Sequence, residues 1–321
     1  MAEIGTDIFA AINHLENGNL VAIPTETVYG LAANAFDNEA VAKIFTAKNR
    51  PSFDPLIVHT SSFDRVSSFT KEINDNTYKL AESFCPGPVT FILKKTETIP
   101  DLVTSGHSTV GVRIPRHPLT QTLLESLEFP VAAPSANPFG YVSPTTAEHV
   151  NQQLGDKLPY ILDGGPSTVG VESTIIDASE DQVKILRLGG LTLEEIEEVL
   201  GRKVDLIKTS SSNPNAPGML FSHYSPGIPL TLGPIDWESL EKSSNTFGVL
   251  TFGKQNNLPK NALEFCLSKS KNVNEAAANL FRGLRYFVGT EVRNIYAEKL
   301  PDEGLGRAIN DRLTRAAATI V

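Results

Sequence analysis

The sequence predicts an α/β protein with two domains, and three observations support that prediction. Its 321 residues are too many for one ordinary compact core and suit two. Over the first two hundred residues, stretches with helical spacing of apolar residues alternate with short apolar runs. The pattern lapses into a segment rich in Ser, Asn and Pro and then returns. We therefore expect domains at residues 1–206 and 228–321, joined by a linker at 207–227.

The N-terminal domain begins with a helix that Thr6 can cap and that Gly18 ends, with apolar residues at helical spacing between them. The short apolar runs predict strands. They lie at residues 20–23, 56–58, 89–93, 110–114, 131–133, 160–162, 174–176 and 183–186. The amphipathic stretches predict helices at 41–47, 79–84, 118–127 and 145–154, with one more beginning at Thr192.

The C-terminal domain shows the same alternation over a shorter length. Strands are predicted at 229–232, 247–252, 264–267 and 294–297, and helices at 274–288 and 307–318. Residues 274–288 form an ordinary amphipathic core helix, because their apolar residues recur on one face. No nucleotide-binding fingerprint accompanies them, so this domain gives no sequence-level sign of a site.

Composition and charge argue against several classes of protein. The two cysteines, Cys85 and Cys266, lie in different halves and form no metal-ligand spacing, which argues against structural zinc or a disulfide framework. A formal net charge of −9 argues against stable binding of nucleic acid. No apolar run approaches the roughly 20 residues of a membrane helix, and the first residues do not resemble a signal peptide. We expect no membrane association and a cytoplasmic location.

The common catalytic and phosphate-binding motifs are absent. The sequence contains neither a G-x-x-x-x-G-K-[ST] loop nor a G-x-G-x-x-G after a strand, so a bound nucleotide must be held in another way. It also lacks G-x-S-x-G and H-E-x-x-H. With no paired nucleophile and base, chemistry is expected to rest on positioning and charge neutralisation.

Five segments rich in Pro, Gly, Ser, Thr and Arg are candidates for a ligand site because they sit where predicted strands end, which is where open α/β sheets bind ligands. They are residues 24–31, 48–59, 108–116 and 132–137, and residues 170–174 together with Arg187. Each has a structural alternative. Residues 24–31 can be a plain strand-to-helix connection, and Lys48 with Arg50 can serve the dipole of a helix end. Arg113, flanked by apolar residues, needs an anionic partner, which a ligand or a structural salt bridge supplies equally well.

The order of these motifs resembles the threonylcarbamoyl-AMP synthase family, in its long two-domain form named Sua5. The motifs are PTETVYGL, KNRPSFDPLIVH, STVGVRIPRH, APSAN, GVEST, Arg187 and HYSP. The resemblance implies a YrdC-like domain with a twisted open α/β sheet and a smaller Rossmann-like C-terminal domain. It implies an enzyme that forms threonylcarbamoyl-adenylate and pyrophosphate from L-threonine, bicarbonate or CO₂, and ATP with Mg²⁺. A downstream tRNA threonylcarbamoyltransferase would use the product for the t6A modification.

The resemblance also implies the roles of individual residues. Those expected to contact L-threonine are Thr27, His59, Arg113, Ala133 through its backbone, and Ser173. Those expected to hold ATP are Arg50, Asp54, Thr109, Ser135, Ser143, Arg187 and Tyr224, the last as part of a linker lid. Lys48 and Arg50 are expected to be catalytic by neutralising phosphate charge. Asp54 stands where the family often has Asn, and an acid beside a triphosphate needs compensation by Mg²⁺ or an arginine.

Two other functions fit parts of the sequence. A concave basic surface on this fold can receive RNA, although the acidic balance and the lack of an aromatic and basic strip count against it. A related enzyme makes a carbamoyl-adenylate from carbamoyl phosphate. Such proteins carry acylphosphatase and zinc-finger modules, for which this chain has neither the length nor the cysteines.

Overall fold

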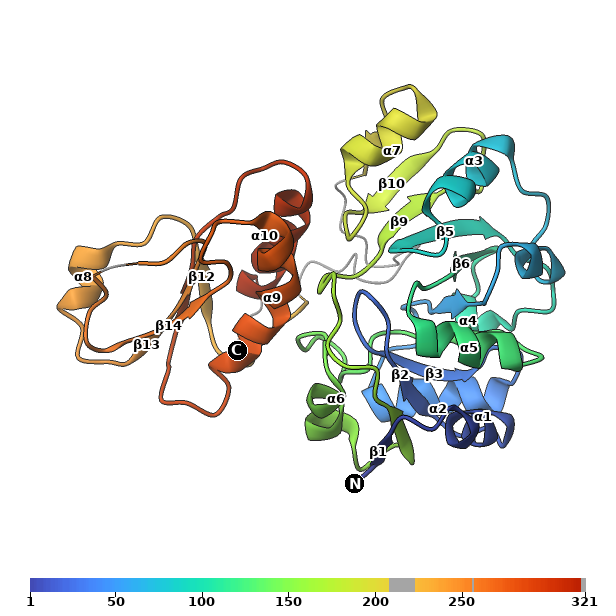
Figure 1. Ribbon diagram of the computed structural model, residues 1–321, viewed down its shortest axis with the longest axis horizontal. Helices are drawn as coiled ribbons and strands as arrows, with labels where there is room; N and C mark the ends of the chain where they lie inside the picture. Colours follow the sequence, from blue (N-terminus) through green and yellow to red (C-terminus); the bar gives the residue numbers. More distant parts are fainter. Residues whose placement is uncertain (208–222, 256, 319–321) are drawn as a thin grey trace. The chain divides into compact units, whose positions relative to one another are not determined.

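The computed structural model describes residues 1–207, 223–255 and 257–318 (Figure 1). The chain divides into two compact units. The N-terminal unit comprises Met1–Phe139, Ser143–Thr168 and Glu172–Leu220, and the C-terminal unit comprises Gly140–Val142, Val169–Val171 and Phe221–Val321. Most of the predicted linker, residues 208–222, lies outside the described residues.

A mixed sheet forms the centre of the N-terminal unit. Its strands, in spatial order, are β1 (Glu3–Gly5), β8 (Tyr160–Leu162), β2 (Val21–Ile23), β3 (Gly30–Asn34), β7 (Val131–Ala132), β4 (Ile57–His59), β6 (Thr109–Arg113), β5 (Val89–Lys94), β9 (Thr174–Asp177), β10 (Lys184–Arg187) and β11 (Asp205–Leu206). Strands β4 and β6 run parallel, as do β5 and β9, whereas β5 and β6 are antiparallel. The α/β class is therefore confirmed, and the sheet is of the open, mixed kind.

The helices of this unit are α1 (Ile8–Glu16), α2 (Asn38–Lys48), α3 (Asp75–Phe84), α4 (Asp101–Thr104), α5 (Pro118–Ser126), α6 (Ala147–Leu154) and α7 (Leu193–Leu200), with a 3₁₀ turn at Asp64–Ser68. The helix predicted to begin at Thr192 is α7, and Thr192 caps it in a capping box with Glu195. The prediction that Thr6 caps α1 was wrong. The cap is Asp7, whose side chain accepts a hydrogen bond from the backbone N–H of Phe9. The sequence pattern did not predict β1, β3, β11 or α4.

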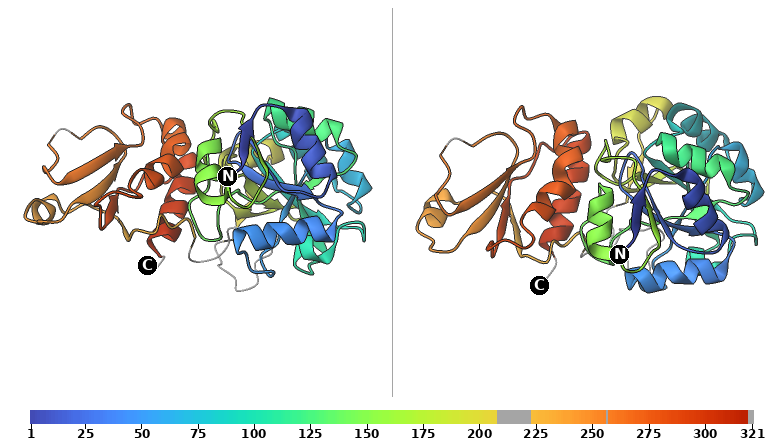
Figure 2. Two further views of the ribbon diagram at one scale, coloured as in Figure 1. Left: turned by 90° about the horizontal axis from the view of Figure 1, so that it is seen from below. Right: turned by 60° about the horizontal axis from the view of Figure 1, so that its bottom comes forward.

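Helices α1 and α2 lie on opposite faces of the first strands of the sheet (Figure 2). On the β2, β3 and β7 side, Ala22, Leu31 and Ala33 face the cluster that contains α2. Their neighbours in the strands, among them Val21 and Ile23, face α1 and α5 instead. This part of the sheet is therefore covered on both faces.

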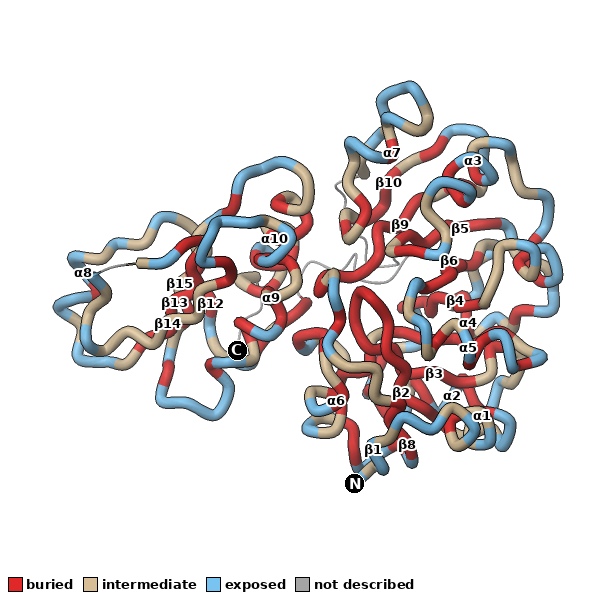
Figure 3. The backbone as a smooth tube through the Cα atoms, viewed as in Figure 1, coloured by how far each residue is buried: buried red, intermediate tan, exposed pale blue. Residues whose placement is uncertain are grey.

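The central strands are different. Val58, Val112 and Phe91 belong to the large core cluster on one face. Their strand neighbours on the other face include Ile57, Ile92 and Ile175, which form a small separate cluster. Because side chains alternate along a strand, this second face also carries Arg113, His59 and Ser173. Figure 3 shows how completely these central strands are buried.

The C-terminal unit has a parallel sheet in the order β12 (Leu230–Leu232), β15 (Ile295–Ala297), β13 (Phe247–Thr251) and β14 (Ala262–Cys266). Its helices are α8 (Trp237–Glu241), α9 (Val273–Tyr286) and α10 (Leu305–Ala317). Leu280, Phe281 and Leu284 of α9 are fully buried, which confirms the predicted core helix. Among all described helices, none has the length and hydropathy needed to span a membrane.

Candidate functional site

The parallel pairing of β4 and β6 places His59 directly beside Arg113. Both side chains are buried, with exposed fractions of 2% and 4%. Burial and the nearby Arg113 charge lower the pKa of His59 to about 3. The imidazole is therefore neutral at physiological pH, so it can offer hydrogen bonds to a ligand but no charge.

Because folding lowers the pKa of His59, this residue should reduce the free energy of unfolding in acid. Below pH 6.5 His59 is protonated in the unfolded chain but stays neutral in the folded chain. The free energy of unfolding therefore decreases as pH falls from 6.5 toward 3. We expect His59→Asn to lose about 2 kcal/mol less stability than the wild type between pH 7.5 and pH 4.5. Urea unfolding at both pH values measures this difference. Equal losses in the two proteins would mean that His59 is protonated in the fold.

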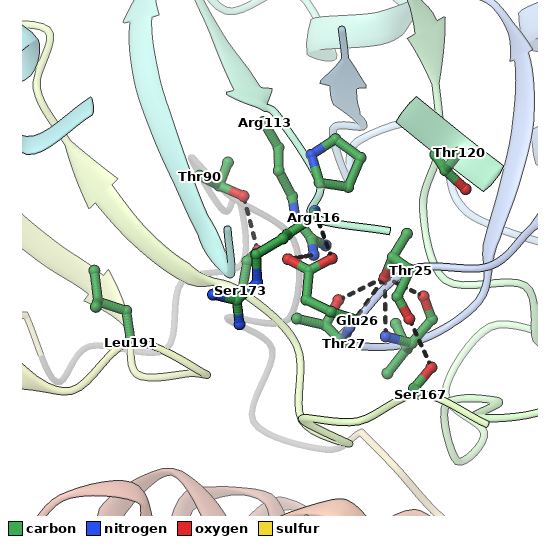
Figure 4. A network of polar contacts seen from close by, with 12 residues as sticks. Thr25, Glu26, Thr27, Thr90, Arg113, Arg116, Thr120, Ser167, Ser173 and Leu191 are labelled. Carbon is green, nitrogen blue, oxygen red and sulfur yellow. Dashed lines mark hydrogen bonds and ion pairs between the residues drawn. The ribbon is translucent and has the colours of Figure 1, made fainter. Parts of the chain in front are cut away.

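The segment after β2 is a strand-to-strand connection, so the structural alternative of a strand-to-helix connection does not apply. It leads into β3, which pairs antiparallel with β2. Thr25 fixes its shape, since its Oγ1 lies 2.9 Å from Thr27 Oγ1 and donates to Val28 O at 2.6 Å. Ser167 Oγ donates to Thr25 O at 2.9 Å and ties the segment to a second loop (Figure 4). Thr27 is thereby held fully buried within the site.

Glu26 in the same segment forms an ion pair with Arg113. Arg113 Nη2 lies 2.8 Å from Glu26 Oε1, and the backbone N–H of Arg116 donates to Oε2 at 3.0 Å. Figure 4 shows the carboxylate between these two donors. The anionic partner predicted for Arg113 thus exists within the chain.

Ser173 joins the site through β5 and β10. Its Oγ lies 2.7 Å from Thr90 Oγ1 on the neighbouring strand β5. Arg187 donates to Ser173 O through both Nε (3.2 Å) and Nη2 (2.8 Å). The structure therefore brings a residue predicted for L-threonine into direct contact with one predicted for the nucleotide.

Lys48 and Arg50 lie at the end of α2 and are both buried. Lys48 Nζ donates to the carbonyls of Ser135 and Asn137, so the lysine does more than complement a helix dipole. Arg50 donates to Asp54 O at 3.0 Å and Pro55 O at 2.8 Å. Burial, followed by the charge of Arg50, lowers the pKa of Lys48 well below its ordinary value.

Asp54 is completely buried among these cations. Its Oδ2 lies 2.9 Å from Arg50 Nη2, in an ion pair rather than an aligned hydrogen bond, and Oδ1 has no hydrogen-bond partner among the described residues. Burial raises the pKa of Asp54, while Arg50, Lys48 and Arg187 act to lower it. The compensation that an acid needs here is supplied by the chain itself.

The segment with Ala133 and Ser135 pairs with the start of β3. Ser135 bridges Gly30, and the N–H of Ala133 donates to Ile57 O at 2.9 Å. A Cβ on Gly30 would lie 3.3 Å from Ala133 Cβ, so glycine permits this close approach. Ser143 Oγ donates to Glu172 Oε1 at 2.6 Å, which places Ser143 next to the Ser173 segment.

Two predicted residues stand apart from this group. Thr109 begins β6 opposite Lys94, at the other end of the strand from Arg113, although alternation puts both on one face. Tyr224 belongs to the C-terminal unit, where it is buried and stacks on Phe281 with ring centroids 5.5 Å apart. Its predicted role in a lid over the nucleotide stays a prediction.

The site residues on the second face of the central sheet lie where strands end, as predicted. His59, Arg113 and Arg187 are the last residues of β4, β6 and β10, and Ser173 directly precedes β9. Sequence reasoning missed Glu26, Thr90 and Glu172 as partners of site residues. The first and third lie inside the motifs PTETVYGL and GVEST, so an acid within a motif was the signal available.

Two family models match the chain. Residues 13–189 match the Sua5/YciO/YrdC family model described as telomere recombination, and residues 191–318 match the C-terminal domain of threonylcarbamoyl-AMP synthase. Curated relatives include threonylcarbamoyl-AMP synthases of Pyrococcus abyssi, 40% identical over 96% of this chain and 93% of that protein, and of Bacillus subtilis, 39% identical over 94% and 90%.

A solved structure resembles this chain to a similar degree in sequence and also in fold. The crystal structure of P. abyssi Sua5 complexed with L-threonine aligns with a TM-score of 0.90 at 40% identity, covering 97% of this chain and 94% of that one. The likeness therefore includes the N-terminal sheet that carries the candidate site and the C-terminal unit.

Proposed function

This chain belongs to the Sua5/YciO/YrdC family, in the two-domain form of the threonylcarbamoyl-AMP synthases, and from that premise we propose the following reaction. It joins L-threonine, bicarbonate or CO₂, and ATP into threonylcarbamoyl-AMP and releases pyrophosphate. The observation that carries the proposal is the buried face on which Arg113 and His59 lie side by side, in a chain that matches a threonine-bound Sua5 over nearly its whole length.

The proposed L-threonine half of the site consists of Arg113, His59, Thr27 and Ser173. A guanidinium is suited to the carboxylate of an amino acid, since it donates several hydrogen bonds in one plane. The neutral imidazole of His59 and the hydroxyl of Thr27 are suited to uncharged polar groups of the substrate. Burial of all of them strengthens these contacts.

The proposed nucleotide half explains why no protein nucleophile is needed. The amine of threonine first forms a bond to carbon of CO₂ and loses a proton, which gives N-carboxy-threonine. Its new carboxylate then forms a bond to the α-phosphorus of ATP, and the bond to the β-phosphate oxygen breaks to release pyrophosphate. Because both reactants are anions, the buried cations Lys48, Arg50 and Arg187 reduce their repulsion.

Magnesium is expected to enter with ATP. Asp54 does not fit as a ligand of that ion, because Arg50, Lys48 and Arg187 already balance its charge, so the phosphates of ATP are expected to hold Mg²⁺. When bound, Mg²⁺ would neutralise part of the phosphate charge. Among the described residues no cluster of three or more His, Cys, Asp or Glu offers a metal site made of protein alone.

Incubation of the purified protein with ATP and Mg²⁺, omitting L-threonine or bicarbonate in turn, tests the proposal. We expect pyrophosphate and threonylcarbamoyl-AMP, identified by mass spectrometry, only when both are present. L-Serine in place of L-threonine serves as a matched control for the side-chain methyl group. Pyrophosphate release that does not depend on L-threonine, or nucleotide binding without formation of any product, would contradict the proposed reaction.

The product is a mixed anhydride that hydrolyses in water, so a consuming enzyme is expected. We propose that it is passed to a tRNA threonylcarbamoyltransferase for the t6A modification of tRNA, and that the protein therefore acts in the cytoplasm. Product formation followed by addition of a transferase and tRNA would show the modified nucleoside. Modification that proceeds equally well without this protein would remove it from that role.

A further inference from the structure

Glu26 is held from two sides by donors of the chain. Its carboxylate is buried, with a side-chain exposed fraction of 4%, and it accepts from Arg113 Nη2 and from the backbone of Arg116. The backbone contact does not depend on the Arg113 side chain. Figure 4 shows both contacts to the carboxylate of Glu26.

Arg113 uses only one of the two nitrogens, Nε and Nη2, on the edge of its guanidinium that faces Glu26. In a guanidinium, Nε and Nη2 point in the same direction and together can bind one carboxylate. Arg187 uses both of these atoms for the single carbonyl of Ser173. Arg113 instead gives Nη2 to Glu26, and its buried Nε has no hydrogen-bond partner in the part of the chain that the structure describes.

A buried donor without an acceptor is costly and rare, so Arg113 Nε is a candidate position for an acceptor atom of a ligand. Glu26 has spare capacity as well. An ionised carboxylate offers about four acceptor positions, and the structure fills two of those on Glu26. One free donor and free acceptor positions thus lie next to each other in a buried site.

We propose that Glu26 and Arg113 act as a pair that recognises the zwitterion of an α-amino acid. Arg113 binds the carboxylate of the substrate through Nε, and Glu26 accepts a hydrogen bond from its α-ammonium group, which then loses one proton to solvent before the amine reacts with CO₂. The inference rests on the proposed function, because it assigns the charge pattern of the L-threonine site. Glu26 is then a substrate-binding residue as well as the group that positions Arg113.

Charge balance gives this pair its selectivity. An unpaired buried arginine would bind any carboxylate, whereas the Glu26–Arg113 pair is already neutral. A simple carboxylic acid would bring one uncompensated negative charge into the buried site, and a simple amine one uncompensated positive charge. An amino-acid zwitterion brings neither, so only the zwitterion leaves every charge paired.

Calorimetry on the wild-type protein provides the first test. The ligands are L-threonine, 3-hydroxybutanoate, which lacks the amine, and L-threoninol, which lacks the carboxylate. We expect both analogues to bind at least about 10-fold more weakly than L-threonine, since each loses one charge-assisted hydrogen bond and leaves a charge unpaired. Binding of 3-hydroxybutanoate as tight as that of L-threonine would overturn the inference. Failure of L-threonine itself to bind would overturn the proposed function as well.

Glu26→Gln provides the second test. We expect L-threonine to bind about 10-fold more weakly, while 3-hydroxybutanoate binds as before or more tightly, so the ratio of the two affinities falls. Asp163→Asn is the matched control, because Asp163 bonds Tyr29 and Gly165 near the same segment without contacting Arg113. An equal loss for both ligands in Glu26→Gln would mean a merely structural role and would refute the pair. If that variant does not fold, the wild-type analogue series decides the question.

Discussion

Replacing Arg113 by Met should lower L-threonine-dependent pyrophosphate release by about 100-fold or more, because the only guanidinium in the proposed L-threonine half is lost. The variant should also be less stable by about 3–5 kcal/mol, since Glu26 remains buried without its ion-pair partner. Initial rates at several L-threonine concentrations, together with urea unfolding, measure the two effects.

The double variant Glu26→Gln/Arg113→Met separates these effects. Removing both charges eliminates the orphaned carboxylate, so most of the lost stability should return. Activity should not return, because the substrate carboxylate still lacks a partner. If the double variant is as unstable as the single one, the ion pair is not the cause of the instability. Near-normal activity in either variant would exclude Arg113 from substrate binding.

Replacing Lys48 by Met should lower ATP-dependent product formation by a similar factor of about 100, because one of three buried cations near the proposed phosphate position disappears. Lys43→Met is the matched control. Lys43 lies on the same helix and its Nζ donates to Gly18 O, away from the site, so its rate should stay near the wild-type rate. Similar rates in the two variants would contradict the assignment of Lys48.

The lowered pKa of Lys48 adds a second readout. Burial favours the neutral amine, whereas bound phosphates favour the ammonium, so binding of MgATP should raise this pKa toward 10.5. At a pH between the lowered pKa and 10.5, wild-type protein should take up protons on binding. Calorimetry in buffers of different ionisation enthalpy detects this uptake, and Lys48→Met should show less of it. Equal uptake in both proteins would assign the protons to another group.

The sequence alone determined the fold class and most of the helices and strands. Periodicity sufficed for α9, whose apolar face is buried as predicted, and a short apolar run sufficed for β8 at Tyr160–Leu162. The start of α7 at Thr192 was also predicted from the local sequence. These features follow from contacts between residues near one another in the chain or from a simple apolar pattern.

The sequence did not predict β3, because most side chains of Gly30–Asn34 are small and none is β-branched, the type that favours strands. This segment becomes a strand because it pairs with β2 and β7. The pairing with β2 requires the chain to turn back after β2, and β7 is distant in the sequence. The same limit applied to the site. The motifs named most of its residues, but not the face of the sheet on which they meet.

Only the tertiary structure decided the charge pairs of the site. Glu26 and Arg113 are 87 residues apart in the chain, and nothing local shows that they share one buried contact. Lys48, at a helix end, would be solvent-exposed if local sequence governed it, yet it is fully buried against the carbonyls of Ser135 and Asn137. Periodicity and composition record which residues are apolar and where elements begin. They do not record which distant carboxylate or carbonyl a buried cation meets, because that depends on strand order and register.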